Sequence, residues 1–310
     1  MMIVRGMLEA NTNAIAASAY STRLNFWNFL NFVIKAFPFS DKACTILTSF
    51  FLILCLYFTT NTYKKQQKRT LVCEREHVTH VTGIACGNGW NSDGIYRGIA
   101  PDTNIVSVKI LDRYGQGNST HAVLGLRWIM DNARKYNIKV VNLSIGTNDR
   151  KVNLPLKEAV ERLWQMGIVV VVAAGNPDGR NGYRPPPAVS SGVISVGAWE
   201  DRSYFQAPVF PLFTKEGGEL PDLWAPGEEI VSVLSPDFDF TLPNRSRQNI
   251  VAQHYITMSG ASMATPLISG AAALLLARNP RAHPAEIKKL LLQKARPFGS
   301  LLTEEVCRTF

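Results

Sequence analysis

The chain of 310 residues has few cysteines and no recognisable cysteine framework. The five present are an odd number without any C-x-x-C spacing: Cys44, Cys55, Cys73, Cys86 and Cys307. This pattern argues against a disulfide scaffold and against a zinc site built on paired cysteines. It also favours a reducing compartment for the folded part of the chain.

A concentrated basic surface is absent as well. Lys and Arg outnumber Asp and Glu by 33 to 24, a formal net charge of +9. Residues 1–76 hold nine basic residues against four acidic ones, so the remainder, with 24 against 20, is only mildly basic. No basic stripe with interleaved aromatic residues is visible, and we therefore expect no nucleic-acid partner. The chain shows no internal repeat or low-complexity run, and its length allows one or two domains.

A serine stands at the start of a long apolar segment. The sequence GASMATP occupies residues 260–266, and LISGAAALLL follows over 267–276. Because proline is tolerated only near a helix start, Pro266 places the beginning of a helix close to Ser262. The first turn of a helix stabilises negative charge, which a serine nucleophile and its oxyanion both require. Ser262 is thus a candidate nucleophile, with a simple helix cap as the alternative.

The sequence does not match two other motifs, those of an α/β-hydrolase and of a dinucleotide-binding fold. An α/β-hydrolase needs a G-x-S-x-G turn and then an acid and a histidine, whereas Ala264 stands two positions after Ser262. The only later histidine is His283, and no Asp or Glu lies between it and Ser262. The glycines around residues 87–89 lack the strand, helix and acidic partner of a dinucleotide-binding motif.

Apolar runs and amphipathic segments alternate between residues 105 and 298. Short apolar runs over 105–111, 139–144 and 168–174 predict buried strands. Helices are predicted after a cap at residues 118–120 and from Pro155 to Gly167. This alternation of strands and helices predicts an α/β fold with a doubly wound, mostly parallel sheet and helices on both faces. Ligands of such folds bind beyond the carboxyl ends of the strands, where Gly146 and Asn176 fall.

Several segments carry a resemblance to a known family. His77 opens HVTHVTG (77–83), VAAGNP covers 172–177, and the serine segment follows in the same chain order. Further matches lie between these segments: RGIAP (97–101), NLSIG (142–146), VISVGA (193–198) and DLWAPG (222–227). Together they resemble the subtilisin-like serine proteases, or subtilases, and most closely bacterial subtilases of the intracellular alkaline-protease type. The resemblance spans residues 77–297, which we expect to form one catalytic domain that is incomplete at its N-terminus.

The resemblance implies roles for individual residues. Ser262 would be the nucleophile and His77 the general base, and the Asn176 amide would complete the oxyanion hole with the Ser262 N–H. Substrate backbone would be bound by four residues: Ser144, Ile145, Gly146 and Gly175. The expected partners are protein or peptide substrates.

Each of these residues also has a plainer interpretation. Asn176 suits a turn, and His77 suits an ordinary helix surface. His77 and His80 share a helical face, but no third ligand has matching spacing, so we expect no metal site there. In the family, the second histidine is structural. No cofactor is expected; a structural calcium ion stays open because no ligand set for it is readable.

The aspartate of the family's catalytic triad has no counterpart. Subtilases carry it in a D-[ST]-G strand some tens of residues before the histidine. Residues 1–76 contain one aspartate, Asp41, followed by Lys-Ala and preceded by no apolar strand. We therefore expect the sheet to lack the strand that carries this aspartate. In subtilisin, its removal lowers kcat by roughly 10⁴-fold.

Other departures from the family lie beside the two main motifs. Val78 replaces a glycine next to the histidine, Ala261 a threonine, and Leu267 a histidine. The sequence thus supports two functions. One is a serine endopeptidase that uses Ser262 and His77. The other is an inactive subtilase relic, or pseudo-protease.

The N-terminal region differs in character from the rest. Residues 43–60 form an uncharged run of 18 residues, the lower limit for a transmembrane helix, and residues 61–76 are a basic linker. The positive-inside rule would then hold the C-terminal domain at the cytoplasmic face of the membrane. Alternatively, residues 1–76 are not native to the domain, and the protein is cytoplasmic. Residues 1–42 are unassigned, and 298–310 form a tail.

Overall fold

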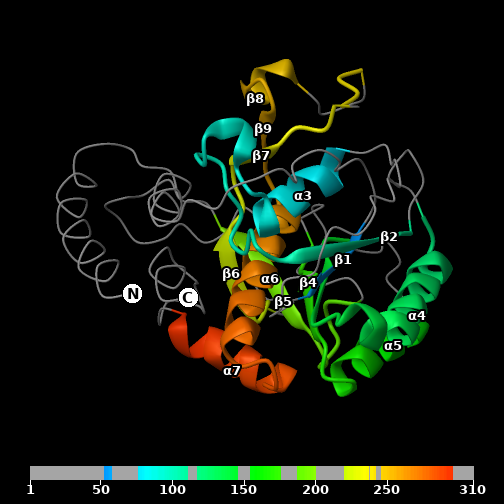
Figure 1. Cartoon of the computed structure of the whole chain (residues 1–310). Coiled ribbons are helices and arrows are strands. Elements are labelled where there is room, and N and C mark those ends of the chain that lie inside the picture. The colour runs from blue at the N-terminus through cyan, green and yellow to red at the C-terminus, as the bar shows by residue number, and fades with distance from the viewer. Residues whose placement is uncertain are drawn as a thin grey trace, which may run out of the picture.

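The structure is a computed structural model with two sheets and a set of flanking helices (Figure 1). It describes residues 52–57, 76–110, 117–145, 154–175, 187–199, 220–236, 238–241 and 246–295. For residues 52–57, only the backbone is described.

The larger sheet has six strands in the order β2-β1-β3-β4-β5-β6. Its parallel part runs from β3 to β6, and each strand pairs with the next along the chain. The strands are β1 (Leu52–Tyr57), β2 (Asn104–Lys109), β3 (Val140–Leu143), β4 (Val169–Ala173), β5 (Ile194–Trp199) and β6 (Leu223–Pro226). The predicted α/β fold with a mostly parallel sheet is confirmed.

Helices cover both faces of this sheet, as predicted. Along β4, Val169 and Val171 pack with residues of α3 (Glu76–Cys86), α6 (Ala261–Arg278) and α7 (Pro284–Lys294). Val170 and Val172 face the other way and pack with α4 (Ser119–Tyr136) and α5 (Leu154–Gln165). A strand buried on both faces must be apolar at every position, which explains the unbroken run of valines.

Local signals set the helix boundaries where the sequence suggested. The Asn118 side chain caps α4 by accepting a hydrogen bond from the His121 N–H at 2.9 Å. Gly167 follows α5 with a φ of 83°, in the left-handed region that glycine adopts without strain. On α5 the buried residues are Leu156, Ala159, Val160 and Leu163, whose spacing places them on one face of the helix.

Two strands differ from expectation. The run predicted as a buried strand over 105–111 becomes β2, whose residues are exposed or half-buried because it lies at the edge of the sheet. The second difference is β1, which lies between β2 and β3 and runs antiparallel to both. Leu52–Tyr57 thus contributes one of the six strands of this sheet and contains no aspartate.

The position of β1 bears on the membrane-helix prediction for residues 43–60, which stays a prediction. In this structure residues 52–57 are paired in the sheet, and the rest of the run lies outside the described residues. A short apolar run suits a buried strand as well as part of a membrane helix, and hydrophobicity alone does not separate them. Among the described residues, α6 is long and apolar enough to cross a membrane, but most of it is buried in the domain core.

The smaller sheet is antiparallel, with the order β7-β9-β8. Its strands are β7 (Ile230–Val233), β8 (Ile250–Ala252) and β9 (Tyr255–Met258), and two short 3-10 helices are η1 (Trp90–Ser92) and η2 (Arg247–Asn249). Helix α3 packs directly on β7 at Gly83, where any Cβ would collide with the Ser232 hydroxyl. The Ser232 hydroxyl donates to the His80 carbonyl at 2.7 Å. This sheet therefore holds α3 in place.

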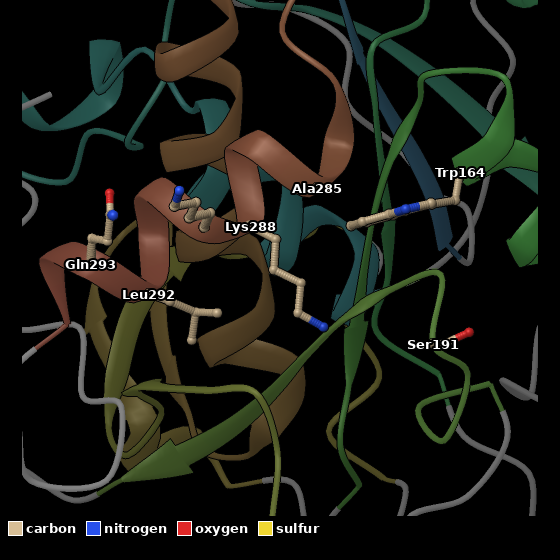
Figure 2. Close-up of a pocket in the computed structure, with 7 residues that line it drawn as sticks. Trp164, Ser191, Ala285, Lys288, Leu292 and Gln293 are labelled. Carbon is tan, nitrogen blue, oxygen red and sulfur yellow. The ribbon is translucent and has the colours of Figure 1, made fainter.

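A pocket of about 580 Å³ lies against α7. Trp164 forms one side and Leu292 the other, with Lys288 reaching between them (Figure 2). None of the residues predicted for catalysis or substrate binding lines it. The ammonium group of Lys288 is already engaged by the protein.

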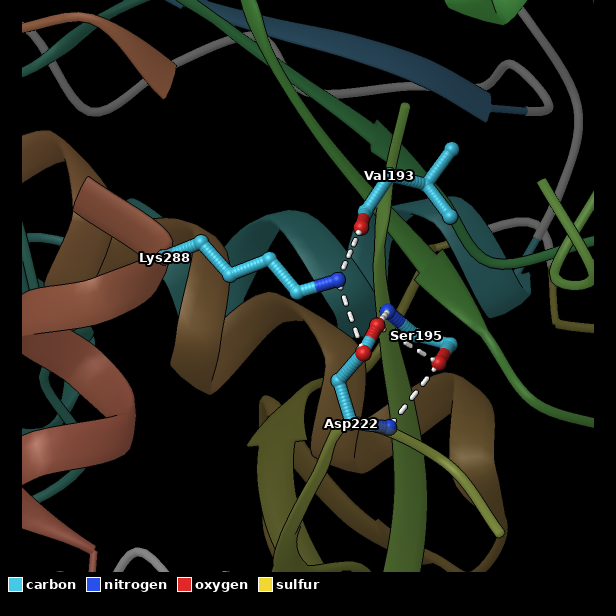
Figure 3. A network of polar contacts seen from close by, with 4 residues as sticks. All are labelled: Val193, Ser195, Asp222 and Lys288. Atoms are coloured by element: carbon cyan, nitrogen blue, oxygen red, sulfur yellow. Dashed lines mark hydrogen bonds and ion pairs between the residues drawn. The ribbon is translucent and has the colours of Figure 1, made fainter. Parts of the chain in front are cut away.

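Lys288 attaches α7 to the sheet (Figure 3). Its ammonium group lies 2.7 Å from the Asp222 carboxylate and donates to the Val193 carbonyl at 2.9 Å. The other carboxylate oxygen of Asp222 accepts from the N–H and hydroxyl of Ser195, each at 2.9 Å. These bonds join α7, β5 and the start of β6 at the amino ends of the strands.

We expect Lys288→Met to destabilise the fold by about 1–3 kcal/mol, because it removes a charge-assisted hydrogen bond from a partly buried carboxylate. Denaturant unfolding measures the change. Lys289→Met, at the exposed neighbouring position, is the matched control and should change stability by less than about 0.5 kcal/mol. Equal effects of the two substitutions would contradict the role given to Lys288.

Candidate active site

Ser262 lies in the first turn of α6, as predicted, and is half-buried. Gly260 precedes the helix with a φ of 142°, and its N–H donates to the Gly227 carbonyl at 2.6 Å. That φ is accessible mainly to glycine, so the sharp entry into the helix depends on this residue. The N-terminal end of a helix is the positive end of its dipole, which favours negative charge in the first turn.

Pro266 has a consequence beyond marking the helix start. It lies inside α6, four residues after Ser262, and has no N–H to donate to the Ser262 carbonyl. That carbonyl instead accepts from the Ser144 hydroxyl at 3.1 Å. In return, the Ser262 hydroxyl donates to the Ser144 carbonyl at 3.3 Å. The proline thus frees the acceptor that attaches the nucleophile segment to the sheet.

The predicted substrate-binding residues are partly described. Ser144 and Ile145 directly follow β3, and Gly175 follows β4 with a φ of 96°. Both positions are at the carboxyl ends of neighbouring parallel strands, where the fold predicts a site. Gly146 and Asn176 come next along the chain and lie outside the described residues, as does Asp41.

His77 lies in the first turn of α3, and this helix packs against α6. The two helices come close at Gly270, where an added Cβ would lie 3.1 Å from the Ala85 carbonyl oxygen. Burial lowers the pKa of His77 to about 4. The imidazole is therefore neutral near pH 7, as a general base must be, although a base with so low a pKa accepts a proton weakly.

His80 has a structural role. Its Nε2 lies 3.0 Å from the carbonyl oxygens of both Ile230 and Ile256, so this nitrogen carries the proton and donates to β7 and β9. Burial lowers the pKa of His80 to about 3. Within the described part of the chain, no group of three or more His, Cys, Asp or Glu residues is placed to hold a metal ion.

Sequence reasoning missed two buried polar residues at the site. Asn142 in β3 donates to the Ser144 hydroxyl at 3.0 Å and accepts from the Ser269 hydroxyl of α6 at 2.7 Å. The available signal was a polar residue inside each of two apolar segments, the VVNL strand and the α6 helix.

Ser262 thus lies in the first turn of a buried helix, at the carboxyl ends of the parallel strands of an α/β fold. A profile of the Subtilase family matches residues 55–306. Serine protease AprX of Bacillus subtilis (strain 168) is 36% identical over 243 residues, which cover 73% of this chain and 54% of AprX. Subtilisin DY of Bacillus licheniformis is 32% identical over 226 residues, covering 72% and 71% of the two chains.

Solved structures agree with these matches. Sphericase superposes with a TM-score of 0.61 at 26% identity, covering 78% of this chain and 76% of its own. The S41 psychrophilic protease gives a TM-score of 0.61 at 25% identity, with 78% and 75% covered. The chain belongs to the subtilase family of subtilisin-like serine proteases. It spans about half the length of AprX.

Stability should fall as the pH is lowered below about 6.5. An unfolded histidine binds a proton near pH 6.5, whereas folded His80 does so only near pH 3, so the unfolded state binds more protons between these values. Each such histidine removes up to about 1.4 kcal/mol of unfolding free energy per pH unit in this window. Denaturant unfolding between pH 7 and 4.5 measures the slope.

His80→Gln should reduce the slope of unfolding free energy against pH by the contribution of about one bound proton. The amide still offers an N–H to the two carbonyls but does not titrate. Gln253→Ala, at an exposed position without a titratable group, is the control and should keep the original slope. A slope unchanged by His80→Gln would overturn the assignment.

Proposed function

We propose that this chain is a serine-type endopeptidase that hydrolyses peptide bonds through an acyl-enzyme on Ser262. The observation that carries the proposal is the placement of Ser262 in the first turn of α6, hydrogen-bonded to Ser144 at the carboxyl end of β3. A nucleophile at this point is close to the positive end of the helix dipole and to the ends of the strands, where substrate can lie.

In the proposed reaction, His77 takes the Ser262 proton and returns it to the leaving amine. The Ser262 hydroxyl donates to the Ser144 carbonyl at 3.3 Å, a long and weak bond. A rotation about χ1 would release the proton from this carbonyl and direct it to the imidazole. The Ser144 carbonyl would then be free to accept an N–H of the bound peptide.

Negative charge on the tetrahedral intermediate would be stabilised by the Ser262 N–H and the Asn176 amide. Support for this role comes from the family resemblance and from the position of Gly175. This glycine directly precedes Asn176 and lies two residues after the end of the buried strand β4. One such donor contributes about 3–4 kcal/mol to catalysis in subtilisin. The extended segment of residues 144–146 would pair with the substrate backbone.

The alternative proposal is an inactive pseudo-protease. It is favoured by β1, which occupies the sheet between β2 and β3 without an aspartate. In the family the aspartate raises the pKa of the imidazole and orients the ring, so its loss would slow turnover.

A fluorophosphonate probe on the purified full chain separates the two proposals. The peptidase should be labelled at one serine, and Ser262→Ala should abolish labelling. Ser259→Ala removes an exposed hydroxyl three residues away, which accepts from the Glu229 N–H, and should leave the label intact. Absence of labelling in the unmodified chain would support the pseudo-protease.

The labelling rate should be nearly constant between pH 6 and 8. The base form of His77 is needed, and with a pKa of about 4 it is almost fully present across this range. The rate should fall only as the pH approaches that value. A half-maximal rate near pH 7 would contradict this and would indicate a carboxylate partner that raises the His77 pKa.

A further inference from the structure

Asn142 is an amide at the centre of the domain core. It is 0% exposed and lies in β3 among Val140, Val141 and Leu143, which are equally buried. Burying an amide is unfavourable unless its hydrogen bonds are replaced, and a valine or leucine would suit this strand better. The amide therefore needs an explanation in terms of its partners.

Its two partners come from different elements. The carbonyl oxygen of the amide accepts from the Ser269 hydroxyl of α6 at 2.7 Å, and its NH₂ group donates to the Ser144 hydroxyl at 3.0 Å. Ser269 is 0% exposed and stands seven residues, or two helical turns, after Ser262. Asn142 thus connects the interior of α6 with the segment beside the nucleophile.

The protons in this network run in one direction. Ser269 donates to Asn142, Asn142 donates to Ser144, and Ser144 donates to the Ser262 carbonyl. If the amide were reversed, its oxygen would face Ser144 and compete for the single hydroxyl proton. The Ser262 carbonyl, which Pro266 leaves without a helical donor, would then lose its partner.

We propose that Asn142 and Ser269 are positioning residues that hold the first turn of α6, and with it Ser262, against the end of β3. The proposal rests on the proposed peptidase function for its catalytic readout. Neither residue touches the reacting atoms; both act through Ser144. Two helical turns of α6 are thereby fastened to one strand, at Ser262 and at Ser269.

Two variants separate positioning from simple stabilisation. Ser269→Ala leaves the Asn142 oxygen buried without this donor and should lower the unfolding midpoint. Asn142→Leu/Ser269→Ala removes both groups and should recover much of that stability, since paired removal of a buried hydrogen bond is nearly neutral. The double variant also removes the donor to Ser144, so it should label with fluorophosphonate roughly tenfold more slowly than the unmodified chain.

If Asn142 and Ser269 only stabilised the fold, the labelling rate of each variant would rise and fall with its stability. Labelling by the double variant at the unmodified rate would therefore overturn the proposal. Ser269→Thr keeps the hydroxyl and should label at the same rate as the unmodified chain. Ser195→Ala is the matched control, because Ser195 is an equally buried serine whose bonds to Asp222 lie at the opposite end of the strands. It should lower stability without slowing labelling of the folded protein.

Hydrogen exchange tests the same proposal without catalysis. Backbone amides over residues 262–265 should exchange about tenfold faster in the double variant, while amides later in α6 stay protected. If the unmodified chain does not label, the peptidase function fails, and this exchange pattern alone decides the positioning role. Unchanged exchange in the double variant would overturn it.

Discussion

The hydrogen bonds between Ser144 and Ser262 join the two parts of the molecule on which the site depends. One part is β3, held in the sheet by its parallel partner β4, and the other is α6, the central helix of one face. The bond from the Ser144 hydroxyl uses the Ser262 carbonyl, which is available because Pro266 has no N–H to donate to it. The carbonyl that lacks its helical hydrogen bond is thus the group through which α6 is attached to the end of β3.

The two ends of the parallel strands carry different polar groups. At the carboxyl edge, Ser144 and Gly175 follow β3 and β4 and lie near the start of α6. At the amino edge, the Asp222 carboxylate collects bonds from Ser195 and Lys288 and attaches α7. The charge-assisted bonds that attach α7 therefore lie at the opposite end of the strands from Ser144 and Ser262.

Helix α3 depends on the small sheet as well as on the core. His80 donates to β7 and β9, and Gly83 allows β7 to approach the helix. His77 lies one helical turn before His80, so these contacts also set where the candidate base stands. Of the two histidines of one motif, His80 is thus structural, and His77 is the base of the proposed reaction.

Much of the architecture was predictable because its signals are local. The position of Ser262 follows from a nearby proline, the burial of β4 from its continuous valines, and the ends of α4 and α5 from Asn118 and Gly167. Such features depend on residues within one or two turns of each other. The sequence by itself therefore determined the fold class and the place of the candidate nucleophile, whereas the candidate base, His77, came from the resemblance to a known family.

Only the tertiary structure decided which groups meet. Ser144 and Ser262 are 118 residues apart, and Asn142 and Ser269 are 127 apart. The antiparallel insertion of β1 between β2 and β3 and the exposure of β2 at the sheet edge are likewise long-range outcomes. Periodicity and propensity describe how a segment folds but not which partner it finds, because pairing depends on the packing of the whole core.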